Sequence, residues 1–307
     1  MQHVALLVCT YRRPRLFAEF IATVDELIVP DDVTLHVAVA DNNPESAWAA
    51  YIGPSLAKLH LPTSYGHETT RGYASARNGS LSLGLATPAT VFLTTDDDQL
   101  LPPDWLTAHL DALDRHGADV VVGGVRGEPP AYAEGDIVAR VSTRNVSFRR
   151  HLADPAGFGL TFDTSFDSTG HEDHDFFRRA AERGARIVWS NGPQVLDNDP
   201  ALATNSAAWL AVAQNRAEVA RASQRNKAAR LRKDGRFLAL GLNTLGSARD
   251  FGKGLLSYVA FFGLSTVRSA RAPLKLARAR QHVVKGLGRI EGLYKDEIAR
   301  QDLRRNG

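Results

Sequence analysis

The chain has 307 residues, 44% of them hydrophobic, with 25 Gly and 14 Pro, which is enough for one large globular domain or for a domain with an appendage. Its one cysteine, Cys9, excludes a disulfide framework and a cysteine-based zinc site, and it fits a reducing compartment. The net charge of +3 divides unevenly, because residues 211–307 hold 21 Lys or Arg against 7 Asp or Glu, a net +14, and residues 1–210 hold 16 against 27, a net −11.

Short apolar runs alternate with helical patterns through the first half of the chain, as in βα units stacked into a mostly parallel sheet. The N-terminal run has no basic segment before it and basic residues directly after it, so it predicts a first strand rather than a signal peptide, and hence a cytoplasmic protein. The predicted strands are 4–8, 35–40, 91–93 and 120–122, and the predicted helices are 14–27, 45–59, 72–85 and one that opens at Pro102.

Polar residues follow three of these strands at the point where each strand ends. The first strand is followed by Thr10 and Tyr11, the second by Asp41, Asn42 and Asn43, and the third by Thr94, Thr95 and the aspartates 96–98. In open α/β sheets, ligands collect at the carboxyl ends of the strands. We therefore expect these three polar groups to meet in one crevice.

The acidic run formed by Asp96, Asp97 and Asp98 predicts a metal site. Three adjacent carboxylates repel one another, so a cation or a cationic ligand is expected at the strand end that carries them. Hard oxygen ligands favour Mg²⁺ or Mn²⁺, which would bridge the carboxylates to a diphosphate. The alternative is a solvated acidic turn, but the apolar strand delivers the run to the ligand-binding edge of the sheet, which favours the metal.

A second acidic run, between Gly170 and Arg179, opens an amphipathic helix that is predicted to end near Gly184. Carboxylates at a helix N-terminus are stabilised by the helix dipole, so capping alone would account for one or two of them. The functional interpretation is a general base that accepts the proton of an attacking hydroxyl. His171 and His174 lack the spacing of the paired histidines in HExxH, and no cysteine supports them, so zinc is the less favoured interpretation.

From about Trp209 onward the pattern is helical and basic. Its most apolar stretch, residues 255–267, is shorter than the roughly twenty residues needed to span a bilayer. Basic residues flank this stretch on both sides, so it is either a helix in a membrane interface or a core helix that docks on the catalytic body. We expect residues 211–307 to contact the inner face of the cytoplasmic membrane peripherally and to bind no nucleic acid.

Six motifs occur in the order and spacing of the family 2 glycosyltransferases, and the chain resembles that family over about residues 3–215. The motifs are VCTYRRPRLF (8–17), VADNNP (39–44), RGYASARNGSL (71–81), FLTTDDDQLLPPDWL (92–106), VSTRNVSFRR (141–150) and GHEDHDFFRRA (170–180). Within the family the chain is most similar to the short enzymes of succinoglycan-type exopolysaccharide assembly, which add glucose to a lipid-linked oligosaccharide.

The resemblance implies a GT-A fold, which is a Rossmann-like α/β domain with a mostly parallel sheet flanked by helices. This catalytic domain would cover residues 1–210, with a nucleotide-binding half (1–100) and an acceptor half (101–210), and a basic helical extension (211–307) would follow it. The resemblance also implies an inverting transfer of a hexose from a UDP-sugar, dependent on Mn²⁺ or Mg²⁺, to a lipid-linked or polysaccharide acceptor.

The same resemblance assigns roles to residues at the motif positions. Donor binding is assigned to Thr10 and Arg12 in the first loop, to Asp41 at the uracil ring, to Arg71, Arg77 and Asn78 near the phosphates, and to Asp96 and Asp97 of the DXD segment. Metal binding is assigned to Asp98, the direct ligand, and to Asp96, with Asp97 as a second contact to ribose or metal. The remaining assignments are Asp173 as the catalytic base, Glu172 as a residue that holds the acceptor or orients the site, and Asn145 and Trp105 as acceptor-side residues.

The segment 195–210 departs from the family pattern, so it gives no indication of the acceptor. A metal-dependent phosphotransferase or phosphatase is one alternative, but Leu100 stands where its aspartate-nucleophile motif requires Thr or Val. A P-loop hydrolase is disfavoured because Gly254 stands where Ser or Thr should bind magnesium. A non-catalytic protein that binds anionic membranes would account for the basic tail but leaves both acidic motifs without a role.

Overall fold

The computed structural model describes residues 1–168 and 170–198, and beyond them only residues 224, 228, 243, 245–250, 252, 253, 256, 283 and 287. The chain divides into two units, Met1–Asp199 and Pro200–Gly307. Apart from Leu256, the predicted apolar helix at 255–267 lies outside the described residues. In the parts of the chain that are described, no helix combines the length and the apolar character that crossing a bilayer requires.

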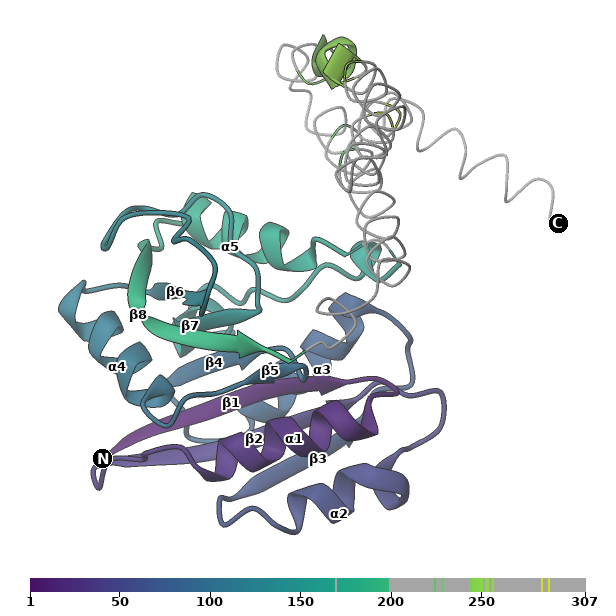
Figure 1. Ribbon diagram of the computed structural model, residues 1–307, viewed down its shortest axis with the longest axis vertical. Coiled ribbons are helices and arrows are strands. Elements are labelled where there is room, and N and C mark those ends of the chain that lie inside the picture. The colour runs from purple at the N-terminus through teal and green to yellow at the C-terminus, as the bar shows by residue number, and fades with distance from the viewer. Residues whose placement is uncertain are drawn as a thin grey trace, which may run out of the picture. The chain divides into compact units, whose positions relative to one another are not determined.

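The described part of the first unit is built on an eight-stranded sheet with the strand order β3-β2-β1-β4-β7-β6-β8-β5 (Figure 1). One half is parallel and consists of β1 (Gln2–Thr10), β2 (Val33–Asp41), β3 (Thr63–His67) and β4 (Val91–Thr95). In the other half β7 (Asn145–Arg149) is antiparallel to β4 and to β6 (Val120–Val125), β6 is parallel to β8 (Ile187–Asp197), and β5 (Gln99–Leu100) is antiparallel to β8. The prediction of a mostly parallel α/β sheet is confirmed, although β3, β5, β7 and β8 are not among the predicted strands.

Helical segments connect many of these strands. They are α1 (Pro14–Asp25), α2 (Gly53–Leu56), α3 (Tyr73–Leu85), α4 (Trp105–Arg115) and α5 (Glu172–Glu182), with a π-helical turn at Trp48–Ile52 and 3₁₀ turns at Arg150–Leu152 and Thr164–Phe166. The helix predicted at 45–59 is therefore too long. Its first residues form a loop instead, because the backbone N–H of Ala47 donates to the carboxylate of Asp41 at 2.7 Å.

Alternate residues of β1 face opposite sides of the sheet, as the two-residue period of a strand requires. Val4, Leu6 and Val8 belong to one apolar cluster, to which α1 and α4 contribute. Ala5 and Leu7 belong to a second cluster, to which α3 and α5 contribute. Helices therefore cover both faces of the sheet.

Helix α1 fixes the loop that follows β1. It begins at Pro14, whose restricted φ suits the first helical turn. Its buried residues Phe17, Phe20, Ile21 and Val24 recur every three or four positions and form the apolar stripe of a helix that packs on a sheet. Residues 11–13 are consequently held at the carboxyl end of β1.

Candidate active site

The polar groups at the ends of β1, β2 and β4 meet. Thr10 ends β1 and is the register partner of Asp41 at the end of β2. The Thr10 hydroxyl donates to Oδ2 of Asp97 at 2.7 Å, in the acidic segment that follows β4. The polar residues that follow these strands therefore lie together at one edge of the sheet, as expected from their positions in the sequence.

Asp97 and Asp98 share one guanidinium group. Nη1 of Arg13 donates to Asp97 Oδ1 at 3.1 Å and to Asp98 Oδ2 at 2.6 Å. Burial raises the pKa of Asp97 to about 6, against the opposing effects of the Thr10 hydrogen bond and the Arg13 charge. Arg13 is not among the predicted site residues. The signal for it was the second arginine directly after β1, at the sheet edge that carries the aspartates.

Arg77 on α3 joins the two acidic motifs. Its Nη2 lies 3.3 Å from Asp96 Oδ1, and its Nε donates to Glu172 Oε1 at 2.8 Å. Burial disfavours the charged guanidinium, but the charges of Asp96 and Glu172 outweigh that effect, so the pKa of Arg77 lies above its usual range. Glu172 is 3% exposed, and its pKa is raised because burial outweighs the charge of Arg77. One buried cation thus links the end of β4 to the first turn of α5.

Asp173 is the second residue of α5, and its negative charge acts on Asp96 of the aspartate run. Its carboxylate accepts hydrogen bonds from the backbone N–H of His174 at 2.6 Å and of Thr143 at 3.4 Å. Burial raises the pKa of Asp96, and the negative charges of Asp98 and Asp173 raise it further, against the lowering effect of Arg77. Since Asp173 directly follows Glu172, the contacts of Arg77 with Asp96 and Glu172 bring the two acidic motifs into one site.

The remaining polar residues of the α5 motif are engaged within the protein. Asp175 accepts hydrogen bonds from Arg178 Nη2 at 3.0 Å and from Arg179 Nε at 2.8 Å on its own helix. His174 Nδ1 donates to the backbone carbonyl of Val141. Of the three carboxylates in the first turn, Asp175 thus pairs with arginines of its own helix, whereas the other two belong to the site.

The aspartate run has the chemistry of a divalent cation site. Asp96 and Asp98 offer hard carboxylate oxygens, and their side chains are 38% and 17% exposed. Both oxygens of Asp97, by contrast, are held by Thr10 and Arg13. Within the described residues, no three His, Cys, Asp or Glu side chains group as a metal site. A cation here would therefore need oxygens from a bound ligand in addition to those of Asp96 and Asp98.

Asp41 lies at the end of β2 with no exposed surface. One oxygen accepts from the backbone N–H and the side-chain amide of Asn43 at 2.9 and 2.7 Å, and the other accepts from Ala47 N–H at 2.7 Å and the Tyr65 hydroxyl at 2.9 Å. Burial raises the pKa of Asp41, but these hydrogen bonds together outweigh burial and lower it. The carboxylate therefore fixes the 42–47 loop, and its assignment to a nucleobase stays a prediction.

Two guanidinium groups flank Tyr11 just after β1. Cζ of Arg12 and Cζ of Arg71 each lie 5.3 Å from the centroid of the Tyr11 ring. Arg12 has a φ of 53°, in the left-handed region that residues other than glycine rarely adopt, and its N–H donates to Asn43 Oδ1 at 2.9 Å. This strained basic turn concentrates positive charge directly after β1.

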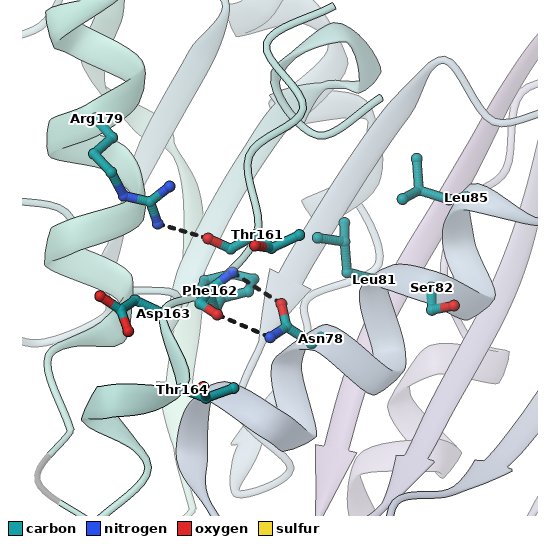
Figure 2. Close-up of a pocket in the computed structure, with 9 residues that line it drawn as sticks. All are labelled: Asn78, Leu81, Ser82, Leu85, Thr161, Phe162, Asp163, Thr164 and Arg179. Carbon is teal, nitrogen blue, oxygen red and sulfur yellow. Dashed lines mark hydrogen bonds between the residues drawn. The ribbon is translucent and has the colours of Figure 1, made fainter. Parts of the chain in front are cut away.

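Asn78 contacts a different part of the molecule, although it follows Arg77 directly. Successive residues of an α-helix differ by about 100° around its axis, so neighbours point in different directions. The Asn78 amide donates to Phe162 O and accepts from Phe162 N–H, both at 2.8 Å. This pair lies at an open groove of about 770 Å³, lined by residues of α3 and by residues 161–164, and Figure 2 shows the two hydrogen bonds. Asn78 thus holds that segment against α3, and its assignment to the donor site stays a prediction.

Asn145 and Trp105 belong to a buried hydrogen-bond network. Asn145 Oδ1 accepts from Trp105 Nε1 and from His109 Nε2, both at 2.8 Å. Asn145 Nδ2 donates to the carbonyls of Gly124 at 2.8 Å and Pro193 at 3.1 Å. The network ties α4, β6, β7 and β8 together. The assignment of Asn145 and Trp105 to an acceptor stays a prediction, because their own polar groups are used within the protein.

A cavity of about 230 Å³ lies against this network at the carboxyl end of β6. Its walls include the rings of Trp189 and Tyr132, whose centroids are 5.9 Å apart, together with the amides of Asn191 and Gln194. Residues 142–145 line it as well, apart from Thr143, whose N–H donates to Asp173. The cavity therefore adjoins Asp173 through this short segment.

His109 makes the stability of the fold depend on pH. Burial lowers the pKa of His109 from an ordinary 6.5 to about 4, against the raising effect of its hydrogen bond to Asn145. Because the unfolded chain binds this proton more readily, the stabilisation from a neutral His109 is complete above pH 6.5 and is lost as the pH falls toward 4. The loss should reach roughly 3 kcal/mol at pH 4. Urea unfolding across this range should give a shallower pH dependence for His109→Gln than for the wild type.

The exposed His60 provides the control for that measurement. Its side chain is 90% exposed, so His60→Gln should leave the pH dependence of the unfolding free energy close to that of the wild type. An identical slope in the wild type and in His109→Gln would show that His109 does not cause the effect.

Comparison with known proteins relates this architecture to enzymes that transfer sugars. The family model for "Glycosyl transferase family 2" matches residues 5–170. The succinoglycan biosynthesis protein ExoM of Rhizobium meliloti is 31% identical over 227 residues, which cover 68% of this chain and 71% of that protein.

Solved structures share the fold at low sequence identity. The mannosyltransferase PcManGT of Pyrobaculum calidifontis, in complex with GDP-Man and Mn²⁺, has a TM-score of 0.62 and 17% identity, over 95% of this chain and 87% of that one. TarS 1–349 of S. aureus in complex with UDP-GlcNAc has a TM-score of 0.52 and 16% identity, over 97% and 92% of the two chains. Against the longer S. aureus TarS chain, the match spans 39% of that protein's length. These likenesses show the GT-A fold.

Proposed function

Because the chain belongs to glycosyl transferase family 2, we propose that it moves a hexose from a UDP-sugar to a lipid-linked or polysaccharide acceptor, with inversion, in the synthesis of a cell-surface polysaccharide. The similarity to ExoM supports the polysaccharide product, and the complexes of PcManGT and TarS with nucleotide sugars support the donor class. The net charge of +14 over residues 211–307 supports peripheral contact with an anionic membrane. Membership of this family decides against the phosphotransferase and non-catalytic alternatives.

The observation that carries the proposal is the pair of acidic motifs held by Arg77. Its guanidinium contacts both Asp96 and Glu172, so one cation joins the run at 96–98 to the first turn of α5. Displacement at a sugar carbon needs two things from a protein. One is a stabilised leaving group, and the other is a base on the opposite face of the sugar. The run at 96–98 offers carboxylates that would hold a cation for the leaving group, and the first turn of α5 offers a carboxylate that would act as the base.

In the proposed mechanism Asp96 and Asp98 would hold a divalent metal, which when bound supplies positive charge to the departing diphosphate. Asp173 takes the proton of an acceptor hydroxyl, whose oxygen forms a bond to the anomeric carbon while the bond from that carbon to the diphosphate oxygen breaks. A single displacement inverts the configuration. Glu172 and Arg77 hold α5 so that Asp173 faces the site, and the basic turn at Tyr11 to Arg13 receives the nucleotide.

A donor screen tests the proposal directly. Thermal unfolding should be followed with UDP-glucose, UDP-galactose, UDP-N-acetylglucosamine and GDP-mannose, each with and without Mn²⁺. We expect one UDP-sugar to raise the unfolding temperature, and to do so much more with Mn²⁺ than without it, because a ligand that binds only the folded state stabilises that state. Stabilisation by none of the four, or by GDP-mannose alone, would contradict the proposed donor.

The cavity beside Asn145 is the proposed site of the acceptor sugar. A sugar ring has apolar faces and hydroxyl edges, which would contact the two aromatic rings and the amides of this cavity. The cavity volume of roughly 230 Å³ is below that of pockets for drug-sized ligands. Ser142 and Arg144 line this cavity on either side of Thr143, so a sugar seated there would contact the segment whose Thr143 N–H donates to Asp173.

Filling that cavity from Gly124 should weaken acceptor binding selectively. A Cβ at Gly124 would lie 3.4 Å from Trp189 Cζ2, which is close to an ordinary contact, so Gly124→Ala and Gly124→Val should fold. The methyl groups of valine would enter the space next to the indole. We expect Gly124→Val to raise the KM for the acceptor about tenfold, and Gly124→Ala to raise it less, because both exclude the sugar from the ring.

The KM for the donor is the control for that series. It should stay unchanged in both Gly124 variants, since the cavity is separate from the turn assigned to the nucleotide. Equal acceptor KM values in the wild type and Gly124→Val would place the acceptor elsewhere.

A further inference from the structure

Two guanidinium groups contact the aspartate run in the described part of the chain, and they differ in how firmly they are held. Arg77 has a side chain that is 17% exposed, and Glu172 fixes its Nε. Arg13 has a side chain that is 46% exposed, and among the described residues the hydrogen bonds of that side chain go to Asp97 and Asp98 alone. Arg13 is therefore the exchangeable cation of this site, and Arg77 is the fixed one.

We propose that Arg13 is a resident counter-ion that keeps Asp98 closed to a divalent metal until the nucleotide donor arrives. This inference rests on the proposed function, because it concerns the metal and the donor of that reaction. It assigns to Arg13 control over the order of binding, so that the metal enters together with the nucleotide and not before it.

The geometry requires one cation to give way to the other. Nη1 of Arg13 lies 2.6 Å from Asp98 Oδ2, an oxygen that a metal on this carboxylate would use. A divalent ion bound there would face the charge of Arg13 at a few ångströms, where like charges repel strongly. Arg13 must therefore leave Asp98 before the metal engages this carboxylate.

The exchange needs only a side-chain rotation. The Arg13 side chain is long and half exposed, and its backbone remains anchored at the N-terminus of α1. A bound diphosphate favours the metal over Arg13 at Asp98. It adds negative charge and further oxygen ligands for the metal, but it does not strengthen the contact between Arg13 and Asp98. The metal alone should therefore bind weakly, and the metal with a nucleotide should bind well.

Binding of Mn²⁺ to the full chain, followed by the electron paramagnetic resonance signal of free Mn²⁺, tests this inference without any turnover. It should be measured for the wild type and for Arg13→Gln, each without nucleotide and with saturating UDP. We expect Arg13→Gln to bind Mn²⁺ about tenfold more tightly than the wild type in the absence of UDP. With UDP present, the two proteins should differ by less than about threefold, because Arg13 has already left Asp98 in the wild type.

Arg15→Gln is the matched control, because it removes the same charge from the same helix. Arg15 pairs with Glu19, and its side chain is 58% exposed, so Mn²⁺ affinity should stay at the wild-type value. Arg13→Lys keeps the positive charge on a shorter group with one donor atom. It should give a smaller gain than Arg13→Gln, and it decides the question if the Gln variant does not fold.

The inference is overturned if Arg13→Gln binds Mn²⁺ no more tightly than the wild type without UDP, or if Arg15→Gln shows the same gain. The donor screen of the wild type judges the proposed function separately. A gain in Mn²⁺ affinity in a protein that no nucleotide sugar stabilises would keep the role of Arg13 as counter-ion and reject the donor.

Discussion

Replacing Asp173 by asparagine is expected to lower the rate of transfer about 10²–10⁴-fold, the usual contribution of a general base. An amide of the same size cannot accept the proton of the acceptor hydroxyl. It can still accept the hydrogen bond that His174 N–H now makes to Asp173 Oδ1 at 2.6 Å, so the first turn of α5 should keep its shape. Transfer should be measured as release of UDP with saturating donor and acceptor.

Two measurements separate a chemical role of Asp173 from a structural one. Stabilisation of Asp173→Asn by the UDP-sugar and Mn²⁺ should equal that of the wild type, because the lost step follows donor binding. Glu182→Gln, at the other end of the same helix, should transfer at the wild-type rate. Turnover by Asp173→Asn within about threefold of the wild type would remove this residue from the role of base.

Replacing Arg77 by methionine is expected to destabilise the fold by about 3–5 kcal/mol, the usual loss when one partner of a buried ion pair is removed. Glu172 would then keep a carboxylate that is only 4% exposed without its cation, and Asp96 would lose its contact as well. The free energy of unfolding in urea at neutral pH measures this loss.

A second substitution should rescue part of that stability. Adding Glu172→Gln to Arg77→Met removes the uncompensated charge, so the double variant should be more stable than Arg77→Met alone. Arg15→Met, at an exposed arginine, should change stability by less than about 0.5 kcal/mol. If Arg77→Met costs less than about 1 kcal/mol, or if the Gln substitution gives no recovery, Arg77 does not act as a buried counter-ion.

The parallel half of the fold could be predicted from its sequence because its strands are continuous apolar runs. β1, β2 and β4 are buried on both faces, which leaves a clear signal, and the polar residues after them mark the edge where the site lies. The prediction of strands from sequence fails where the burial of a strand depends on hydrogen-bond partners far away in the sequence. β7 alternates polar Asn145 and Ser147 with apolar residues, and it lies inside the sheet because Trp105 and His109 satisfy those polar groups from α4.

The candidate site likewise has parts that the residue types predict and parts that only tertiary packing determines. The run at 96–98 and the motif of Asp173 could be predicted as two acidic groups of one site, since their acidic character is visible in the residue types. Their connection through Arg77 could not, because that residue was assigned to phosphates and lies on a helix whose rotation only tertiary packing sets. For Arg13 the signal was present, but which of two adjacent arginines turns toward the aspartates depends on the left-handed backbone at Arg12.

The contacts of Arg77 with Asp96 after β4 and with Glu172 on α5 also constrain how chimeras of such enzymes can be built. A chimera that imports the acidic segment 96–98 from another enzyme but keeps α3 and α5 would set foreign carboxylates against a cation placed for the original ones. The smallest transplantable block therefore runs from α3 to α5, and shorter exchanges aimed at a new sugar specificity should yield proteins that accumulate poorly before their specificity can be assayed.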